Sequence, residues 1–153
     1  MITIREARKD EIPQLQLLNK EALAANETYD ADAIPDWGIT EYGKTFFTNL
    51  LNTPTSCCFV AEIDGTLVGY IGASEKIVTY RKSKYVEIDN IGIIPAYCSQ
   101  GIGSMLITAC KQWAKENGYQ RVYVNSYAAN YKAIAFYERN GFTKIDTCLE
   151  IIL

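Results

Sequence analysis

The sequence predicts an α/β (α+β) fold in which helices flank a central mixed, mostly antiparallel sheet. Three observations support this prediction. β-rich runs surround an Asp64-Gly65 turn, apolar residues recur at helical spacing before and after them, and a strand–helix–strand order follows in the second half. The chain has 153 residues, 48% of them hydrophobic, and shows no internal repeat or linker. Residues 1–153 are therefore expected to form a single domain.

The first third of the chain is expected to contain one strand and two helices. A short strand is expected from Thr3 to Ala7, and Asp10 is a suitable N-cap for a helix that begins near Glu11. The apolar residues of this helix recur at helical spacing: Ile12, Leu15, Leu18 and Ala22. A loop is expected from 26 to 40, and a second helix is expected to end before Pro54.

The middle of the chain is expected to form three strands. Cys57–Ile63 and Leu67–Tyr80 are β-rich, and the Asp64-Gly65 pair between them is typical of a tight hairpin turn with positive φ at both residues. A third strand is expected from Tyr85 to Ile94, and Pro95 ends it.

The second half is expected to continue with helices and shorter strands. A helix is expected from Ile102 to the Asn117-Gly118 stop, followed by a strand from Val122 to Tyr127. Asn130 is expected to cap a helix that runs through Arg139. Residues 142–153 have a strand-like composition, so a final strand is expected there.

Composition excludes several classes of protein. Histidine is absent, which removes imidazole bases and histidine metal ligands, and five cysteines without a CxxC spacing suggest neither a disulfide framework nor a metal site. A net charge of −3 without a basic run argues against nucleic-acid binding. The uncharged run from 90 to 110 is too rich in polar residues and glycine for a membrane span, and the first residues lack signal-peptide features. A cytoplasmic protein is expected.

A glycine-containing turn between the strand at 85–94 and the helix that follows is a candidate anion site. Gly101 and Gly103 lie where unpaired main-chain N–H groups and the helix dipole favour negative charge. The Walker pattern fails because no lysine follows, and the dinucleotide pattern GxGxxG fails at Leu106. Taken alone, the glycine pair is equally compatible with an ordinary tight turn.

Three local patterns together extend this observation. They are the strand from Glu87 to Pro95, the turn from Cys98 to Ser104, and the segment from Asn130 to Phe142, which reads N-x-x-A-x-x-x-Y-x-x-x-G-F. In this order and spacing the chain resembles the GNAT superfamily of N-acetyltransferases over nearly its whole length. The turn is similar to the superfamily's pyrophosphate loop, Q/R-x-x-G-x-G/A, except that Cys98 stands where Gln or Arg is usual.

The resemblance implies acetyl-CoA as co-substrate and an amine, of a small molecule or a peptide, as acceptor. The cofactor-binding residues that it implies are Ile91, Gly92, Ile93, Cys98, Ser99, Gln100, Gly101, Ile102, Gly103, Ser104, Asn130 and Tyr137. The Cys98 departure predicts weaker cofactor affinity, because a side-chain contact to the pyrophosphate is missing. Cys98 is either a thiol activated by the helix dipole or a neutral substitute.

The resemblance also implies catalytic roles. Tyr137 occupies the general-acid position, and a phenol with an ordinary pKa near 10 stays protonated at neutral pH. The alternative is an aromatic residue packed on an amphipathic helix. Glu87 and Asp89 alternate along their strand, so both carboxylates are expected on one side. Family spacing selects Asp89 as the base acting through water, and a solvated carboxylate is the alternative.

The acceptor and the assembly stay open at this point. The loop from Tyr29 to Glu41 combines acidic and aromatic residues, which suits a cationic amine, although a solvated acidic loop explains the same composition. The main competing function is a non-catalytic acyl-CoA-binding or sensing domain of the same fold. A monomer and a homodimer are both compatible with the sequence.

Overall fold

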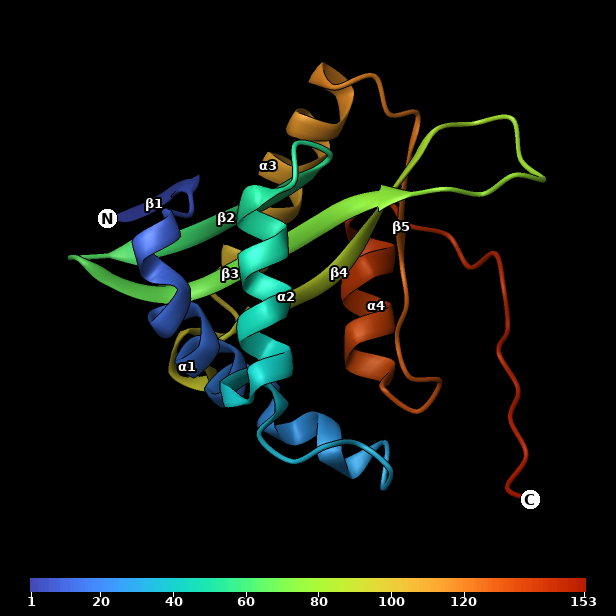
Figure 1. The fold of residues 1–153 in the computed structure, drawn as a ribbon, viewed down its shortest axis with the longest axis horizontal. Coiled ribbons are helices and arrows are strands. Elements are labelled where there is room, and N and C mark those ends of the chain that lie inside the picture. The colour runs from blue at the N-terminus through green and yellow to red at the C-terminus, as the bar shows by residue number, and fades with distance from the viewer.

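A computed structural model describes residues 1–153 and shows an α/β fold. Figure 1 shows a twisted sheet with α1 and α2 in front of it and α3 behind it. The strands are β1 (Ile2–Glu6), β2 (Ser56–Ile63), β3 (Thr66–Lys76), β4 (Tyr85–Ile93) and β5 (Arg121–Val124). The helices are α1 (Ile12–Leu23), α2 (Glu41–Asn52), α3 (Ile102–Glu116) and α4 (Tyr131–Arg139). None of them combines the length and hydropathy that a membrane span requires.

The sheet is mixed and mostly antiparallel, as the sequence predicts. Its strand order is β1-β2-β3-β4-β5, with antiparallel pairing up to β4 and parallel pairing between β4 and β5. The β2–β3 hairpin turns at Asp64 (φ 48°) and Gly65 (φ 81°), so the predicted turn with two positive φ angles is confirmed.

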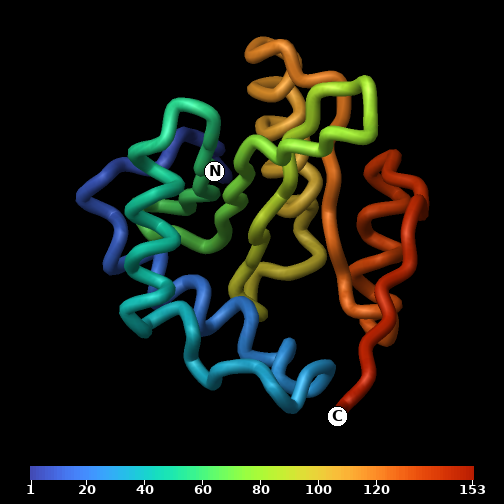
Figure 2. The backbone as a smooth tube through the Cα atoms, turned by 45° about the vertical axis from the view of Figure 1, so that its right-hand side comes forward, coloured from blue at the N-terminus to red at the C-terminus, as the bar shows by residue number.

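Two apolar cores lie on opposite faces of the sheet. Behind it, the apolar stripe of α3 that includes Leu106 and Cys110 packs on Ile71 and Val86. In front of it, Leu15 of α1 and Phe47 of α2 pack with other residues of both helices and the facing strands. The helical spacing that predicted these faces therefore corresponds to burial. Figure 2 shows the same arrangement turned by 45°, with α4 on the far side of β5 from α1 and α2.

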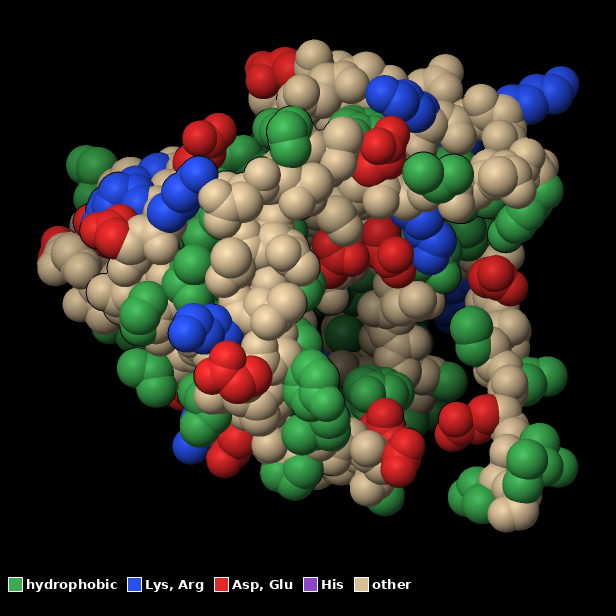
Figure 3. All heavy atoms as spheres, in the orientation of Figure 1, with side chains coloured by type: hydrophobic (Ala, Val, Ile, Leu, Met, Phe, Trp, Pro, Cys, Tyr) green, Lys and Arg blue, Asp and Glu red, His purple; other side chains and the backbone are tan.

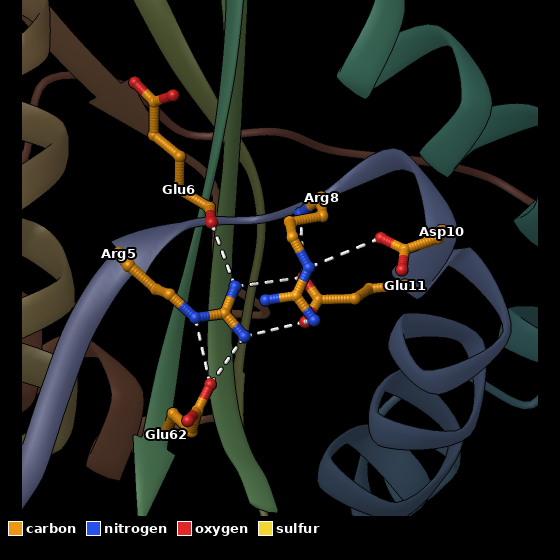
Figure 4. Close-up of polar contacts among 6 residues, drawn as sticks. All are labelled: Arg5, Glu6, Arg8, Asp10, Glu11 and Glu62. Atoms are coloured by element: carbon orange, nitrogen blue, oxygen red, sulfur yellow. Dashed lines mark hydrogen bonds and ion pairs between the residues drawn. The ribbon is translucent and has the colours of Figure 1, made fainter. Parts of the chain in front are cut away.

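The start of the first helix differs from the prediction. Asp10 does not cap it. Instead, a short 3₁₀ turn (Lys9–Glu11) precedes α1, and Glu11 is 3% exposed. Its carboxylate accepts a hydrogen bond from the Arg8 backbone N–H (2.7 Å) and pairs with Arg5 (2.7 Å), as Figure 4 shows. Arg5 also pairs with Glu62 of β2, so the buried carboxylate joins β1, β2 and the entry to α1.

Several strand ends also differ from the prediction. β3 ends at Lys76 instead of Tyr80, and the β5 ladder covers only Arg121–Val124. The final strand expected over 142–153 is wrong, because these residues have no secondary structure. Figure 1 shows this segment leading away from the sheet. A strand needs a hydrogen-bonding neighbour, and residues 142–153 have none within the chain.

Candidate active site

β4 and the edge strand β5 diverge partway along β4. Their parallel pairing begins at Tyr85↔Arg121 and ends at Ile88↔Val124, although β4 continues to Ile93. The N–H of Ile94 donates to the carbonyl of Val68 on β3 (3.0 Å). Since main-chain groups alternate in direction along a strand, the N–H groups of Ile91 and Ile93 point away from β3, toward the side that β5 has left. Gly92 lies between these two donors.

After β4, a short 3₁₀ helix (Pro95–Tyr97) and a turn lead into α3. Ser99 (φ 65°) and Gly101 (φ 80°) both have left-handed backbone conformations, and Gly101 is the N-cap residue. The first helical hydrogen bond runs from the Met105 N–H to the Gly101 carbonyl (3.1 Å). The N–H groups of residues 102–104 therefore have no acceptor within the helix and lie at the positive end of its dipole. This turn contains the predicted residues Ser99, Gln100, Gly101, Ile102, Gly103 and Ser104.

Cys98 stands at the entry to this turn, and its side chain points back toward the end of β4. Its Sγ lies 3.8 Å from the carbonyl oxygens of both Ile93 and Ile94. The thiol is thus a weak donor to the strand end. The free main-chain N–H groups of residues 102–104 are available as donors to an anion at this turn.

The Phe136 ring of α4 packs against Gly103 at the start of α3. A Cβ added at Gly103 would lie 2.8 Å from Cζ of Phe136, so a larger residue there would force this ring to shift. Asn130 caps α4 as predicted, since its Oδ1 accepts the Ala133 N–H (3.1 Å). The next helical residue after Phe136 is Tyr137, which brings its ring to the same region.

Tyr137 is largely buried among aromatic rings. Its ring centroid lies 5.4 Å from that of Phe136 and 5.6 Å from that of Phe142. Burial raises the pKa of Tyr137 to about 12, so the phenol is protonated over the neutral range. Its hydroxyl makes no hydrogen bond within the chain, which leaves the proton available for a ligand.

A β-bulge changes how the two candidate carboxylates are placed. The β3–β4 register shifts between Gly72 and Ala73, which pair with Asn90 and Ile88, so Asp89 has no partner on β3. Simple alternation therefore does not describe Asp89. Both carboxylates nevertheless meet at one place on β3.

That meeting place is Ser74. It is the register partner of Glu87, and its hydroxyl donates a hydrogen bond to Asp89. Glu87 is engaged by Lys76, whose Nζ lies 3.2 Å from Oε2. Desolvation raises the pKa of Asp89 above its usual range, the Ser74 hydrogen bond opposes this, and the nearby Glu87 charge adds to it. Asp89 is thus a carboxylate without an ion-pair partner and with a raised pKa.

The predicted acidic loop contacts the loop between β5 and α4 through Tyr29 and Asp30. The Tyr127 hydroxyl, on the β5–α4 loop, donates to Asp30 (3.1 Å), and Tyr29 stacks on Tyr127 with ring centroids 5.9 Å apart. Asp36 instead pairs with Lys20 (3.4 Å), outside this contact. In Figure 3 the face is hollowed between α2 and α4, and acidic side chains lie at the edge of the hollow.

A buried polar network, which the sequence did not indicate, supports β4 from the side of α1. Asn19, 3% exposed, donates from Nδ2 to the Tyr70 hydroxyl (2.7 Å), which in turn donates to Asn90. Burial raises the pKa of Tyr70, so this link stays protonated. In the sequence, the feature that could have indicated this network is Asn19, a polar residue next to Leu18 in a helix with an apolar face.

The comparison with known protein families gives a match over most of the chain. A model described as the acetyltransferase (GNAT) family matches residues 18–142.

Curated relatives agree with this match. An N-alpha-acetyltransferase of Sulfurisphaera tokodaii is 30% identical over 151 residues, covering 93% of this chain and 80% of the relative. An uncharacterised N-acetyltransferase of Methanocaldococcus jannaschii is 28% identical and covers 92% of this chain. This chain spans only 60% of the length of that second relative.

Among solved structures, an aminoglycoside N-acetyltransferase in complex with CoA superposes with a TM-score of 0.78. It is 18% identical, and the match covers 100% of this chain and 95% of that one. At this identity the likeness shows the fold alone.

Proposed function

The chain belongs to the acetyltransferase (GNAT) family, and on this premise we propose that it transfers an acetyl group from acetyl-CoA to a primary amine of a small molecule or peptide. The amine attacks the thioester carbonyl directly, the carbon–sulfur bond breaks, and the thiol of CoA and an amide are the products. The observation that carries the proposal is the divergence of β4 from β5. It leaves the N–H groups of Ile91 and Ile93 without a strand partner, and the side chains of Ile91, Ile93 and Tyr137 pack against the same core.

The donor fits the turn before α3. A pyrophosphate is an anion that the free N–H groups of residues 102–104 and the helix dipole favour. Because the Cys98 side chain points toward Ile93 and Ile94, these main-chain groups supply the binding. Bound acetyl-CoA supplies the activated acetyl group. The residues of the chain orient that group and stabilise charge.

Two kinds of donor then serve the reaction. The N–H groups of Ile91 and Ile93 point where the thioester oxygen gains negative charge, and fixed donors of this kind stabilise such an oxyanion. Tyr137, with a pKa raised to about 12, keeps its proton over the neutral range and is present as a donor. The departing thiolate sulfur gains negative charge, so Tyr137 serves as the group that donates to it, as the general acid of the reaction.

Asp89 is the better candidate for the base. The attacking amine must lose a proton, and a carboxylate acting through water can accept it. The carboxylate of Glu87 is paired with Lys76 at 3.2 Å, whereas Asp89 has only the Ser74 hydroxyl. The raised pKa of Asp89 also makes it a stronger base than an ordinary aspartate.

A cationic amine suits the contact between Tyr127 and the loop that contains Tyr29 and Asp30. Asp30, Tyr29 and Tyr127 place one carboxylate and two aromatic rings together, and such groups attract ammonium ions by charge and by cation–π contact. The deciding experiment incubates the purified chain with acetyl-CoA and a panel of amines, polyamines and peptides, and measures thiol release. Amine-dependent release supports the proposal. No release with any acceptor class contradicts it.

One observation favours a second candidate, a non-catalytic acyl-CoA-binding domain. Cys98 replaces the Gln or Arg usual in the family's loop and points away from the turn. Isothermal titration with CoA, run beside the thiol-release assay, separates the two functions. Binding without turnover identifies the sensor, and binding with turnover identifies the enzyme.

A further inference from the structure

The side-chain amide of Asn90 on β4 is oriented from within the core. Its Oδ1 accepts a hydrogen bond from the Tyr70 hydroxyl, and that hydroxyl accepts one from Nδ2 of Asn19 (2.7 Å). Since a hydroxyl has a single proton to donate, the bond from Asn19 leaves Tyr70 as the donor to Asn90. The buried pair therefore fixes which end of the Asn90 amide faces β3.

The other end of this amide has no partner in the chain. The oxygen and the nitrogen of an amide diverge from the same carbon, so the N–H2 group of Asn90 points away from the Tyr70 hydroxyl. It donates no hydrogen bond, and the one buried side-chain polar atom without a partner is the hydroxyl of Tyr85. Asn90 is partly exposed, so its two N–H donors reach solvent.

Asn90 lies beside the groups proposed for the reaction. In the chain it stands between Asp89, the proposed base, and Ile91, which supplies an open N–H group. Tyr70 and Ser74 are four residues apart on β3, so their side chains share one face of the sheet. Because Tyr70 binds Asn90 and Ser74 binds Asp89, the two neighbouring side chains of β4 lie on that same face.

Two glycines explain why no side chain of the sheet accepts from this N–H2 group. Gly72 on β3 is the register partner of Asn90, and Leu50 of α2 fills the space that a Cβ there would need, with Cδ2 at 2.5 Å. Gly92 follows on β4, and a Cβ there would lie 3.1 Å from Cε1 of Tyr70. An acceptor for the N–H2 group of Asn90 therefore comes from a bound molecule.

We propose, on the premise of the acetyl transfer inferred above, that Asn90 determines specificity by donating from Nδ2 to an oxygen atom near the amine of the acceptor. This contact favours amines that carry a carbonyl, ether or hydroxyl oxygen close to the nitrogen over plain alkylamines. A site that hydrogen-bonds a substrate group rejects analogues without it, because its own polar group is then left unpaired. Asn19 and Tyr70 are positioning residues, since they hold the amide and do not touch the acceptor.

The test compares matched acceptors by thiol release. Each amine that the panel shows to be acetylated is paired with an analogue in which a methylene group replaces the oxygen-bearing group nearest the nitrogen. Butylamine is the analogue of methoxyethylamine in this sense, and sec-butylamine is that of alaninamide. The ratio of the two kcat/KM values is measured for each pair. Because a nearby oxygen also lowers the pKa of the amine itself, the deciding quantity is the change of this ratio on substitution.

Asn90→Asp is the deciding variant. It keeps an oxygen for the Tyr70 hydroxyl and replaces the outward donor with an acceptor, so the ratio is expected to fall about tenfold, the equivalent of one hydrogen bond. Asn125→Asp is the matched control, because Oδ1 of Asn125 also accepts from a tyrosine hydroxyl, that of Tyr123 (2.9 Å), and the variant gains the same charge. Its ratio is expected to stay unchanged.

Tyr70→Phe tests the positioning role. Without the hydroxyl the Asn90 amide can rotate, so the ratio is expected to fall by about threefold while the KM for acetyl-CoA stays nearly unchanged. A loss of folded protein would lower both rates of a pair equally and would leave the ratio as it was. An unchanged ratio in this variant therefore overturns the positioning role.

The outcomes separate the specificity of Asn90 from the acetyl transfer itself. A ratio that is unchanged in Asn90→Asp, or that falls equally in Asn125→Asp, overturns the role of Asn90 and leaves acetyl transfer standing. The same holds if every acetylated amine lacks an oxygen near its nitrogen. No thiol release with any amine contradicts the acetyl transfer, and the role of Asn90 is then overturned with it.

Discussion

The hydroxyl of Ser74 on β3 donates a hydrogen bond to Asp89, the residue that the bulge of β4 leaves without a partner. This bond stabilises the charged carboxylate, whereas desolvation and Glu87 destabilise it. The net result is a raised pKa for Asp89 at a point where β4 begins to separate from β5. The first two predictions test this relationship.

Replacing Asp89 with Asn is expected to lower kcat by about 10²–10⁴-fold, the usual contribution of a general base. Glu87→Gln is the matched control, because Glu87 lies on the same strand but is paired with Lys76. Its effect on kcat is expected to stay below about tenfold. Steady-state rates with saturating acetyl-CoA measure both. Equal losses in the two variants would contradict the assignment of Asp89.

Replacing Ser74 with Ala is expected to raise the pKa of Asp89 further, because the hydrogen bond that favours the charged form is lost. The base acts when ionised, so the acidic limb of the kcat/KM profile moves to higher pH. A hydrogen bond to a charged group corresponds to a shift of about one pH unit. Thr66→Ala, at the other end of β3, serves as the control and leaves the profile in place. If the acidic limb of the kcat/KM profile does not move in the Ser74 variant, Ser74 does not influence the pKa of the catalytic base.

Tyr137→Phe is expected to lower kcat by about 10²–10⁴-fold and to leave the KM for acetyl-CoA nearly unchanged. Tyr131→Phe on the same helix is the control, because Tyr131 is 77% exposed and its rate should stay within about twofold of the unmodified protein. With a pKa of about 12, Tyr137 produces no loss of activity between neutral pH and pH 10. If the Phe variant keeps full turnover, another group protonates the leaving thiolate.

Glu11→Gln is expected to lower the free energy of unfolding at pH 7 by about 1–3 kcal/mol, since it removes the partner of a partly buried arginine. The hydrogen bond from Arg5 lowers the pKa of Glu11 below its ordinary 4.5. The stabilisation is therefore present above pH 4.5 and is lost as the pH falls through the lower, folded-state pKa.

Urea unfolding at pH 7 and at a series of acidic pH values measures this effect. The variant is expected to lose less stability on acidification than the unmodified protein does. Asp10→Asn is the control, because the Asp10 side chain is 78% exposed and its ion pair with Arg8 contributes little. Parallel acid profiles for the Gln variant and the unmodified protein would disprove the linkage.

Gly92→Ala is expected to destabilise the fold by about 1–3 kcal/mol, because overpacking forces neighbouring elements apart. A Cβ at this position would lie 2.7 Å from Cβ of Ala22 on α1. The double variant with Ala22→Gly removes that clash. Its loss of stability is expected to be smaller than the sum of the two single losses, which a double-mutant cycle measures. Additive losses would place the strain elsewhere, for example at Tyr70.

Local patterns predicted the local structure. The Asp64-Gly65 turn, the Asn130 cap and the apolar stripe of α3 depend on neighbours within a few residues, and all three are present. The family motif located the glycine-containing turn before α3 and Tyr137 in the sequence. The mixed sheet also followed, because hairpin-connected strands pair antiparallel and a strand–helix–strand connection joins parallel strands.

The features that the sequence missed depend on partners far along the chain. The bulge at Asp89 exists only because β4 is registered against β3, and Tyr127 meets Asp30 across 97 positions of sequence. The strand expected at 142–153 failed for the same reason. Its composition favours a strand, but composition does not supply a neighbour.

The short ladder between β4 and β5 has a mechanical consequence. Only four residue pairs, from Tyr85↔Arg121 to Ile88↔Val124, join β5 to β4 and thus to the antiparallel part of the sheet. β5 leads directly into the segment that holds α4, so a small tilt about this fastening changes how far Tyr137 stands from the open N–H groups of Ile91 and Ile93. A ligand bound where β4 and β5 diverge fixes that separation, and the amide protons of β5 then exchange with solvent more slowly.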